Sequence, residues 1–203
     1  MKSLFGLLAK FPEPGTVKTR LAREIGARPA AGIYRSIAER VFINTLPEGP
    51  GFERVVFYSP VDALSRFEEW LPGERFLPQS GGDIGEIMIK AIQDLFDLGA
   101  SKAVIAGVDI PGLRREIVRD AFLKLDISDV VIGPATDGGY YLIGMKAASP
   151  GCFRNISWST AQVFDETIRN IRELGLKYST VEVLSDVDRI EDISGLSFPV
   201  RRF

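Results

Sequence analysis

Three short polar segments carry residue types that can handle a phosphorylated ligand. The first contains Gly15 followed by Lys18 and Arg20, and the other two are acidic turns built around Asp109 and Asp137. Carboxylates are ligands for Mg²⁺, whereas lysine and arginine side chains bind phosphate oxygens. The chain therefore offers acids for a metal ion and bases for phosphates.

Lys18 and Arg20 lie at the predicted start of a helix near Thr19. Free backbone N–H groups and the helix dipole favour an anion at such a position. A solvated basic helix start would carry the same residues, and the local sequence does not separate these interpretations. The segment is not a P-loop, because Val17 stands where that motif requires glycine before its lysine.

The first acidic turn directly follows an apolar run that ends at Gly107. Pro111 biases Ile110 toward an extended backbone, so the carboxylate of Asp109 should project from a defined turn. A magnesium ion takes one or two such carboxylates and shares its other positions with water and phosphates. As an alternative, Asp109 caps the helix that follows.

Asp137 belongs to an Asp-Gly pair, which is typical of a tight hairpin turn, so a structural role competes with a catalytic one. The adjacent Gly138 and Gly139 permit close backbone approach to a ligand. We therefore keep Asp137 as a candidate metal ligand and as the group that orients or deprotonates an acceptor.

Other acids and aromatics favour structural interpretations. Asp83 and Glu86 have the spacing of a helix capping box. The core is the favoured place for Trp158, with the lining of an acceptor pocket as the alternative. The acids near the C-terminus are interpreted as turn and cap residues, with a metal role for Asp188 as the minor alternative; they are Asp186, Asp188 and Asp192.

Short apolar runs typical of strands alternate with segments of helical periodicity, and these elements must position the polar segments. The predicted strands are 3–10, 54–59, 102–107, 130–134 and 140–145, with a further one at 178–184. The predicted helices are 29–46, 61–71, 84–98, 114–125 and 160–174, the last capped by Ser159 or Thr160. Strands alternating with helices indicate parallel crossovers, while 130–135 and 140–145 indicate a hairpin. We expect one α/β domain over residues 1–203, with helices on both faces of a mixed, mostly parallel sheet.

Composition narrows the function classes. The formal charge is −2, which argues against nucleic-acid binding by bulk attraction. Histidine is absent, which removes Ser-His-Asp and Cys-His catalysis, and the single Cys152 excludes an intrachain disulfide. No apolar stretch is long enough to span a membrane. We expect a cytoplasmic protein, and the sequence leaves its oligomeric state open.

Five ordered motifs together resemble the glycosyltransferase-like domain of unknown function 2064. They are Ala9-Lys10-Phe11-Pro12-x-Pro14-Gly15-x-Val17-Lys18-Thr19-Arg20-Leu21, Gly107-x-Asp109-x-Pro111-x-Leu113, Gly133-Pro134-Ala135-x-Asp137-Gly138-Gly139-Tyr140-Tyr141, Trp158-Ser159-Thr160, and Asp186-Val187-Asp188 with Glu191-Asp192. The resemblance spans nearly the whole chain. It departs at one place: the family commonly has arginine after the glutamate of a Leu-Gly-Glu-Arg stretch, and this chain has Ile87 after Glu86.

The resemblance implies the GT-A fold of nucleotide-diphospho-sugar transferases, a three-layer α/β/α sandwich, with Asp109 as a metal-binding aspartate. The expected function is transfer from a nucleotide-diphospho-sugar to a small acceptor with Mg²⁺ or Mn²⁺. Lys18, Arg20 and Asp137 are the catalytic candidates. Lys10, Gly15, Lys18, Arg20, Gly138 and Gly139 are the phosphate-binding candidates.

Two alternatives to glycosyl transfer stay open. The first is a nucleotidyltransferase that joins an NTP to a phosphorylated small molecule and releases pyrophosphate, since Lys18 and Arg20 suit that leaving group equally well. The second, motivated by Ile87, is a non-catalytic nucleotide-binding protein. The sequence does not identify the base, the sugar or the acceptor.

Overall fold

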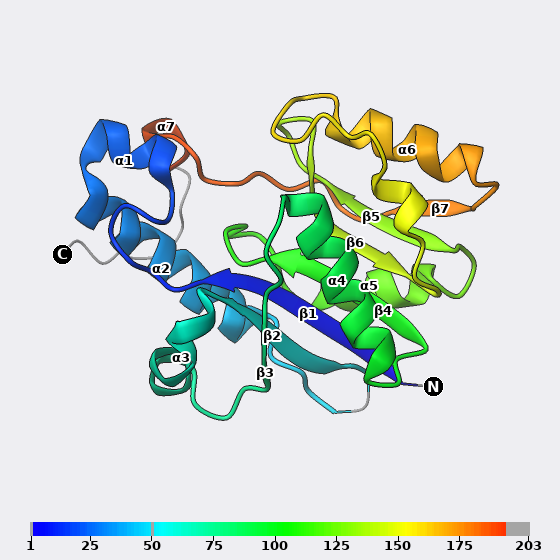
Figure 1. Cartoon of the computed structure of the whole chain (residues 1–203), viewed down its shortest axis with the longest axis horizontal. Helices are drawn as coiled ribbons and strands as arrows, with labels where there is room; N and C mark the ends of the chain where they lie inside the picture. The colour runs from blue at the N-terminus through cyan, green and yellow to red at the C-terminus, as the bar shows by residue number, and fades with distance from the viewer. Residues whose placement is uncertain (1, 50, 194–203) are drawn as a thin grey trace.

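The computed structural model describes residues 2–49 and 51–193 (Figure 1). Its strands are β1 (Ser3–Lys10), β2 (Glu53–Ser59), β3 (Phe76–Pro78), β4 (Lys102–Gly107), β5 (Val130–Pro134), β6 (Tyr140–Met145) and β7 (Tyr178–Thr180). Its α-helices are α1 (Thr19–Ile25), α2 (Ala27–Asn44), α3 (Leu64–Trp70), α4 (Ile84–Asp97), α5 (Arg115–Lys124), α6 (Val163–Glu173) and α7 (Ile190–Ile193). Two 3₁₀ turns, η1 (Val61–Ala63) and η2 (Pro150–Phe153), complete the described elements.

All seven strands form one sheet in the order β3-β2-β1-β4-β6-β5-β7. β1 pairs in parallel with both β2 and β4, and β5 pairs in parallel with β7. β6 is antiparallel to both of its neighbours, β4 and β5. The expectation of a mixed, mostly parallel sheet with one hairpin is confirmed.

Each face of the sheet buries its own apolar core, which makes the molecule a three-layer α/β/α sandwich. On one face α2 and α5 cover side chains such as Phe5 and Val104, which point to that side. On the other face α4, α6 and η2 cover Leu4 and Ile105. This alternation along β1 and β4 arises because successive side chains of a strand point to opposite faces.

Three local predictions differ from the structure. The short edge strand β3 was not predicted, because three residues are too few for a period-two pattern to stand out. The strand predicted for 178–184 ends at Thr180, although Leu184 forms a single parallel bridge to Ala135. The cap predicted for α6 is wrong: the helix begins at Val163, and Gln162 precedes it without a side-chain cap.

Another local prediction, the capping box, is confirmed. Asp83 and Glu86 form a complete capping box at the start of α4, each side chain accepting a backbone N–H of the other residue. Within the described ranges no helix has the length and apolarity that a membrane span requires.

Candidate active site

Four segments that carry candidate residues leave the same edge of the sheet. β1, β4, β5 and β7 run in one direction: β1 is parallel to β4, β7 is parallel to β5, and β4 and β5 are both antiparallel to β6, which lies between them in the sheet. Their carboxyl ends lead into residues 11–18, 108–114, 135–139 and 181–189. The last segment crosses the top of the sheet to α7, which lies beside α1 (Figure 1). In open α/β sheets this edge is where ligands bind.

A pocket of about 870 Å³ opens at this edge. Seven charged residues named in the sequence analysis line it: Lys10, Lys18, Arg20, Asp109, Asp137, Asp186 and Asp188. Gly139 also lines the pocket, whereas Gly15 and Gly138 do not. The volume lies within the range of pockets that hold small ligands and cofactors. The structure thus gathers residues from distant parts of the sequence around one cavity.

Lys18 forms the centre of the charged end of the pocket. Its Nζ donates to Asp109 Oδ2 and to Asp188 Oδ1, each at 2.9 Å. The side chain is only 4% exposed. Burial lowers the pKa of Lys18, but the two carboxylates outweigh it, so this pKa lies above its ordinary value. The ammonium group therefore stays charged and joins the first loop to the first acidic turn.

Asp188 is the main site residue that the sequence interpretation placed elsewhere. Its second oxygen, Oδ2, accepts a hydrogen bond from Arg20 Nη1 at 3.1 Å. Its carboxylate thus binds both Lys18 and Arg20, a role beyond that of a turn residue. The backbone groups that a turn residue would satisfy are instead bound by Asp192, whose Oδ2 accepts from the N–H groups of Asp188 and Arg189.

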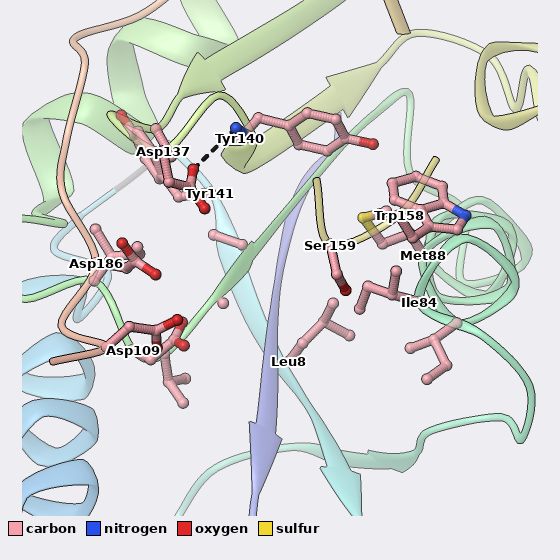
Figure 2. A pocket seen from close by; sticks show the side chains of 18 of the residues that line it. Leu8, Ile84, Met88, Asp109, Asp137, Tyr140, Tyr141, Trp158, Ser159 and Asp186 are labelled. Atoms are coloured by element: carbon pink, nitrogen blue, oxygen red, sulfur yellow. Dashed lines mark hydrogen bonds between the residues drawn. The ribbon is translucent and has the colours of Figure 1, made fainter. Parts of the chain in front are cut away.

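Further carboxylates surround this cluster. Figure 2 shows Asp186 between Asp109 and Asp137 on one side of the pocket. Burial raises the pKa of Asp186 to about 6, and the nearby carboxylates of Asp188, Asp137 and Asp109 add to this effect, while Lys18 opposes it. The charged end therefore carries more negative charge than its two bases neutralise.

Buried neighbours fix the turn of Asp109. Val108 and Ile110 are 2% and 3% exposed, so the apolar core holds the backbone on both sides of the aspartate. A Cβ on Gly107 would lie 2.9 Å from Asp109 Oδ1, so glycine leaves room for the carboxylate to fold back. The alternative of a helix cap fails, since α5 begins after Arg114.

The Asp137 turn is a hairpin turn as well as part of the pocket wall. Asp137 Oδ1 accepts the N–H of Gly139 at 2.9 Å, a bond drawn in Figure 2. Gly138 packs on the loop before α6, and its carbonyl accepts the N–H of Phe164 at 2.9 Å. The structure thus gives Gly138 a packing role, while its contact with phosphate stays a prediction.

The opposite end of the pocket is apolar (Figure 2). Ile84 and Met88 on α4 face this end together with Trp158. A Cβ on Gly85 would lie 2.7 Å from Trp158 Cζ2, so the indole packs directly on the α4 backbone. Trp158 is half-buried against the core and also lines the cavity, and its contact with an acceptor stays a prediction. Ile87, the residue that departs from the family pattern, also lines it.

Tyr34 links the end of β1 to α2. Its hydroxyl accepts the backbone N–H of Lys10 at 2.9 Å and donates to the Lys10 carbonyl at 3.1 Å. Burial raises the pKa of Tyr34, and the negative charge of Asp109 adds to the effect. The neutral phenol thus holds the backbone from which the first loop departs. Sequence periodicity alone assigned Tyr34 to a helix and gave no signal for this contact.

The chemistry of the donors fits a hard divalent cation. Asp109 and Asp188 each direct a carboxylate oxygen at one positive charge, the Lys18 ammonium. Across residues 2–49 and 51–193, no three acidic, histidine or cysteine side chains already converge as a metal site. A pair of carboxylates is what Mg²⁺ commonly takes, with water and phosphate completing its coordination.

Comparison with known proteins identifies relatives in sequence and structure. A protein from Desulfovibrio desulfuricans G20, named as a candidate nucleotide-diphospho-sugar transferase, is 36% identical and has a TM-score of 0.88; the match covers 95% of this chain and 85% of that one. This relative supports a nucleotide-using transferase. A search of curated proteins finds no match.

More distant structures share the fold. A nucleotidyl transferase from Methanothermobacter thermautotroptrophicus is 15% identical with a TM-score of 0.58, and the match covers 94% of both chains. A CMP:2-keto-3-deoxy-manno-octonic acid synthetase solved with CTP is 12% identical with a TM-score of 0.56, and the match covers 96% of both chains.

The family model described as "uncharacterized protein conserved in bacteria" (DUF2064) matches residues 42–160, which is more than half of the chain. That range contains Asp109, Asp137 and Trp158, three of the pocket residues. The agreement between this match, the 36% identical relative and the shared fold leads to one conclusion. The chain belongs to the DUF2064 family.

Proposed function

We propose that the chain is a metal-dependent transferase that moves a glycosyl group from a nucleotide-diphospho-sugar to a small acceptor. The observation that carries this proposal is the meeting of Lys18 and Arg20 with Asp109 and Asp188 at one end of a single pocket. A diphosphate needs positive charge around its oxygens, and a divalent cation needs carboxylates. The name of the 36% identical relative supports the same donor class.

In the proposed reaction the acceptor hydroxyl oxygen forms a bond to the anomeric carbon of the donor sugar. The bond from that carbon to the diphosphate oxygen breaks, and its electron pair leaves with the nucleoside diphosphate. Arg20 binds the leaving phosphates through its planar fork, and Lys18 adds a point charge. Asp137, at the pocket wall, accepts the acceptor proton.

Mg²⁺ or Mn²⁺ would be held by Asp109 and Asp188, with Asp137 as the further candidate from the sequence. When bound, the metal supplies charge stabilisation to the departing diphosphate. Asp109 is held rigidly enough for this role by its buried neighbours Val108 and Ile110. Asp188 reaches the same point because its segment leaves the same sheet edge.

Nucleotidyl transfer is the second candidate, because the fold is shared with a nucleotidyl transferase over nearly the full length of both chains. In that reaction an acceptor phosphate oxygen bonds to the α-phosphorus of an NTP, and the bond to the β-phosphate bridging oxygen breaks to release pyrophosphate. Lys18 and Arg20 would bind the β- and γ-phosphates. Detection of pyrophosphate in place of a nucleoside diphosphate would select this reaction.

The test is calorimetry of metal-free protein with UDP-glucose, GDP-mannose, GTP and CTP, each with and without Mg²⁺ or Mn²⁺. Glycosyl transfer predicts metal-dependent binding of a nucleotide-sugar that is lost in Asp109→Ala. A preference for a triphosphate would favour nucleotidyl transfer. Binding without turnover of any acceptor would instead favour the non-catalytic alternative, and full activity of Asp109→Ala would exclude the proposed mechanism.

A further inference from the structure

The Lys18 ammonium group occupies the space between the two carboxylates that are best placed for a divalent cation. It lies 2.9 Å from one oxygen of Asp109 and 2.9 Å from one oxygen of Asp188. Its side chain is 4% exposed, whereas those of Asp109 and Asp188 are 40% and 30% exposed. The positive charge is therefore inside the cluster, and the carboxylates face both it and the pocket.

The backbone of Lys18 adds a second observation. Lys18 has φ 45° and ψ 48°, which places a non-glycine residue in the left-handed region. This conformation is costly for a residue with a Cβ and persists where the surroundings determine it. Lys18 immediately precedes α1 and its side chain does not cap that helix. Its contacts include the two ion pairs of the side chain and the N–H of Ala22, which its carbonyl accepts at 2.8 Å.

A magnesium ion and the ammonium group cannot share this position. Mg²⁺ bonds carboxylate oxygens at about 2.0–2.1 Å, so the ion would sit closer to the oxygens of Asp109 and Asp188 than Nζ does. The ammonium group and a magnesium ion that both contacted these carboxylate oxygens would also repel each other strongly in a partly buried site. A metal bound by both carboxylates therefore requires Lys18 to withdraw.

We propose that Lys18 is the resident counter-ion of Asp109 and Asp188, and that it is displaced when a divalent cation binds there. This inference rests on the proposed function for the place to which Lys18 moves, namely the phosphates of the ligand. Arg20 does not need to leave, because it binds Oδ2 of Asp188, the oxygen that Lys18 does not use. The lysine thus couples the loading of the metal to the binding of phosphate.

Coupling of this kind is reciprocal. A ligand phosphate that accepts the ammonium group frees the two carboxylates for the metal, and the metal frees the ammonium for phosphate. The protein without nucleotide then binds divalent cations weakly, because each cation must first replace an internal ion pair. This consequence can be measured without turnover.

The experiment measures Mn²⁺ binding to nucleotide-free protein by electron paramagnetic resonance. Lys18→Met removes the charge while keeping an unbranched side chain, and it is expected to bind Mn²⁺ at least tenfold more tightly than the unmodified protein. Lys146→Met is the matched control, since Lys146 also pairs with a carboxylate, that of Asp129, but does not line the pocket. Its Mn²⁺ affinity is expected to stay within about twofold of the unmodified protein. The tighter binding must be lost in Lys18→Met combined with Asp109→Asn.

A second measurement does not depend on the stability of Lys18→Met. The ¹³Cε lysine signals of the unmodified protein are followed during titration with Mg²⁺, and the Lys18 signal is assigned by its loss in Lys18→Arg. Displacement predicts that this signal moves to the position of a solvent-exposed lysine as Mg²⁺ saturates. An unmoved signal with Mg²⁺ bound at Asp109 would overturn the proposal, as would equal or weaker Mn²⁺ binding by folded Lys18→Met.

These results separate the two proposals. Tighter Mn²⁺ binding in Lys18→Met without binding of any nucleotide would support the counter-ion role and count against the proposed function. Metal-dependent turnover by the unmodified protein, together with unchanged metal affinity in Lys18→Met, would support the proposed function and overturn the counter-ion role. Absence of Mn²⁺ binding in both the unmodified protein and Lys18→Met would overturn the counter-ion role.

Discussion

Gly138 and Ala161 bring two loops of the site into backbone contact. A Cβ on Gly138 would lie 2.3 Å from the carbonyl oxygen of Ala161 and 2.7 Å from its Cα. Gly138 also has φ +89°, a conformation that L-residues rarely adopt. This contact fastens the turn of Asp137 to the loop that carries Trp158 and Ser159, so it determines the shape of the pocket wall.

Gly138→Ala is therefore expected to destabilise the protein by about 2–4 kcal/mol, because it adds backbone overlap to the cost of the left-handed conformation. Gly15→Ala is the matched control: Gly15 has φ +87°, and nothing lies within 4 Å of a Cβ built on it. We expect that variant to lose only about 1–2 kcal/mol. The measurement is urea unfolding, and equal losses in both variants would contradict the packing role.

Asp188→Asn should impair nucleotide binding about as strongly as Asp109→Asn. Each substitution removes one of the two carboxylate charges that surround Lys18, and Asp188→Asn also weakens the contact to Arg20. Loss of a charge-assisted pair in a partly buried site predicts a tenfold or larger decrease in affinity for the donor nucleotide with Mg²⁺.

The control for Asp188→Asn is Asp192→Asn, because Asp192 lies nearby in α7 and, among the described residues, accepts hydrogen bonds from the backbone N–H groups of Asp188 and Arg189. We expect Asp192→Asn to change affinity by less than about threefold. Calorimetry of the three variants measures these differences. If Asp188→Asn binds the donor nucleotide with normal affinity, Asp188 has only the structural role in a turn that the sequence suggests.

Tyr34→Phe removes the hydroxyl that satisfies both backbone polar groups of Lys10. Leaving these groups without their partner in a buried setting is expected to cost about 1–3 kcal/mol of unfolding free energy. Because the first loop departs from Lys10, the same variant should also weaken phosphate binding. Ile33→Val changes another buried residue of the same helix. It tests whether any packing change on α2 weakens phosphate binding, or only the loss of the Tyr34 hydroxyl.

Cys152 should be unreactive in the folded protein. Its side chain is buried, and burial raises the pKa of the thiol to about 11, so the reactive thiolate is scarce at pH 8. A thiol reagent such as Ellman's reagent is expected to label it only after unfolding in urea. Rapid labelling of one thiol per chain under native conditions would show that this side chain is accessible.

Sequence patterns predicted most of the framework for identifiable reasons. Continuous apolar runs predicted β1 and β4, because a strand buried on both faces is apolar throughout. Apolar residues at helical spacing predicted α4, because one face of that helix is buried. The capping box of Asp83 and Glu86 was predicted equally well, since both partners lie within one turn of helix. The three-residue strand β3 was missed because its place at the sheet edge depends on pairing with β2.

The sequence by itself also determined which chemistry is available: no histidine, one cysteine, and acids and bases grouped in motifs. Only the tertiary structure decided that Asp188, rather than Asp137, shares a cation with Asp109. The physical reason is strand direction: β4 and β5 are both antiparallel to β6, and β7 is parallel to β5, so the segments after β4, β5 and β7 leave the same edge of the sheet. Carboxylates separated along the chain then meet around Lys18, a relationship that no local pattern encodes.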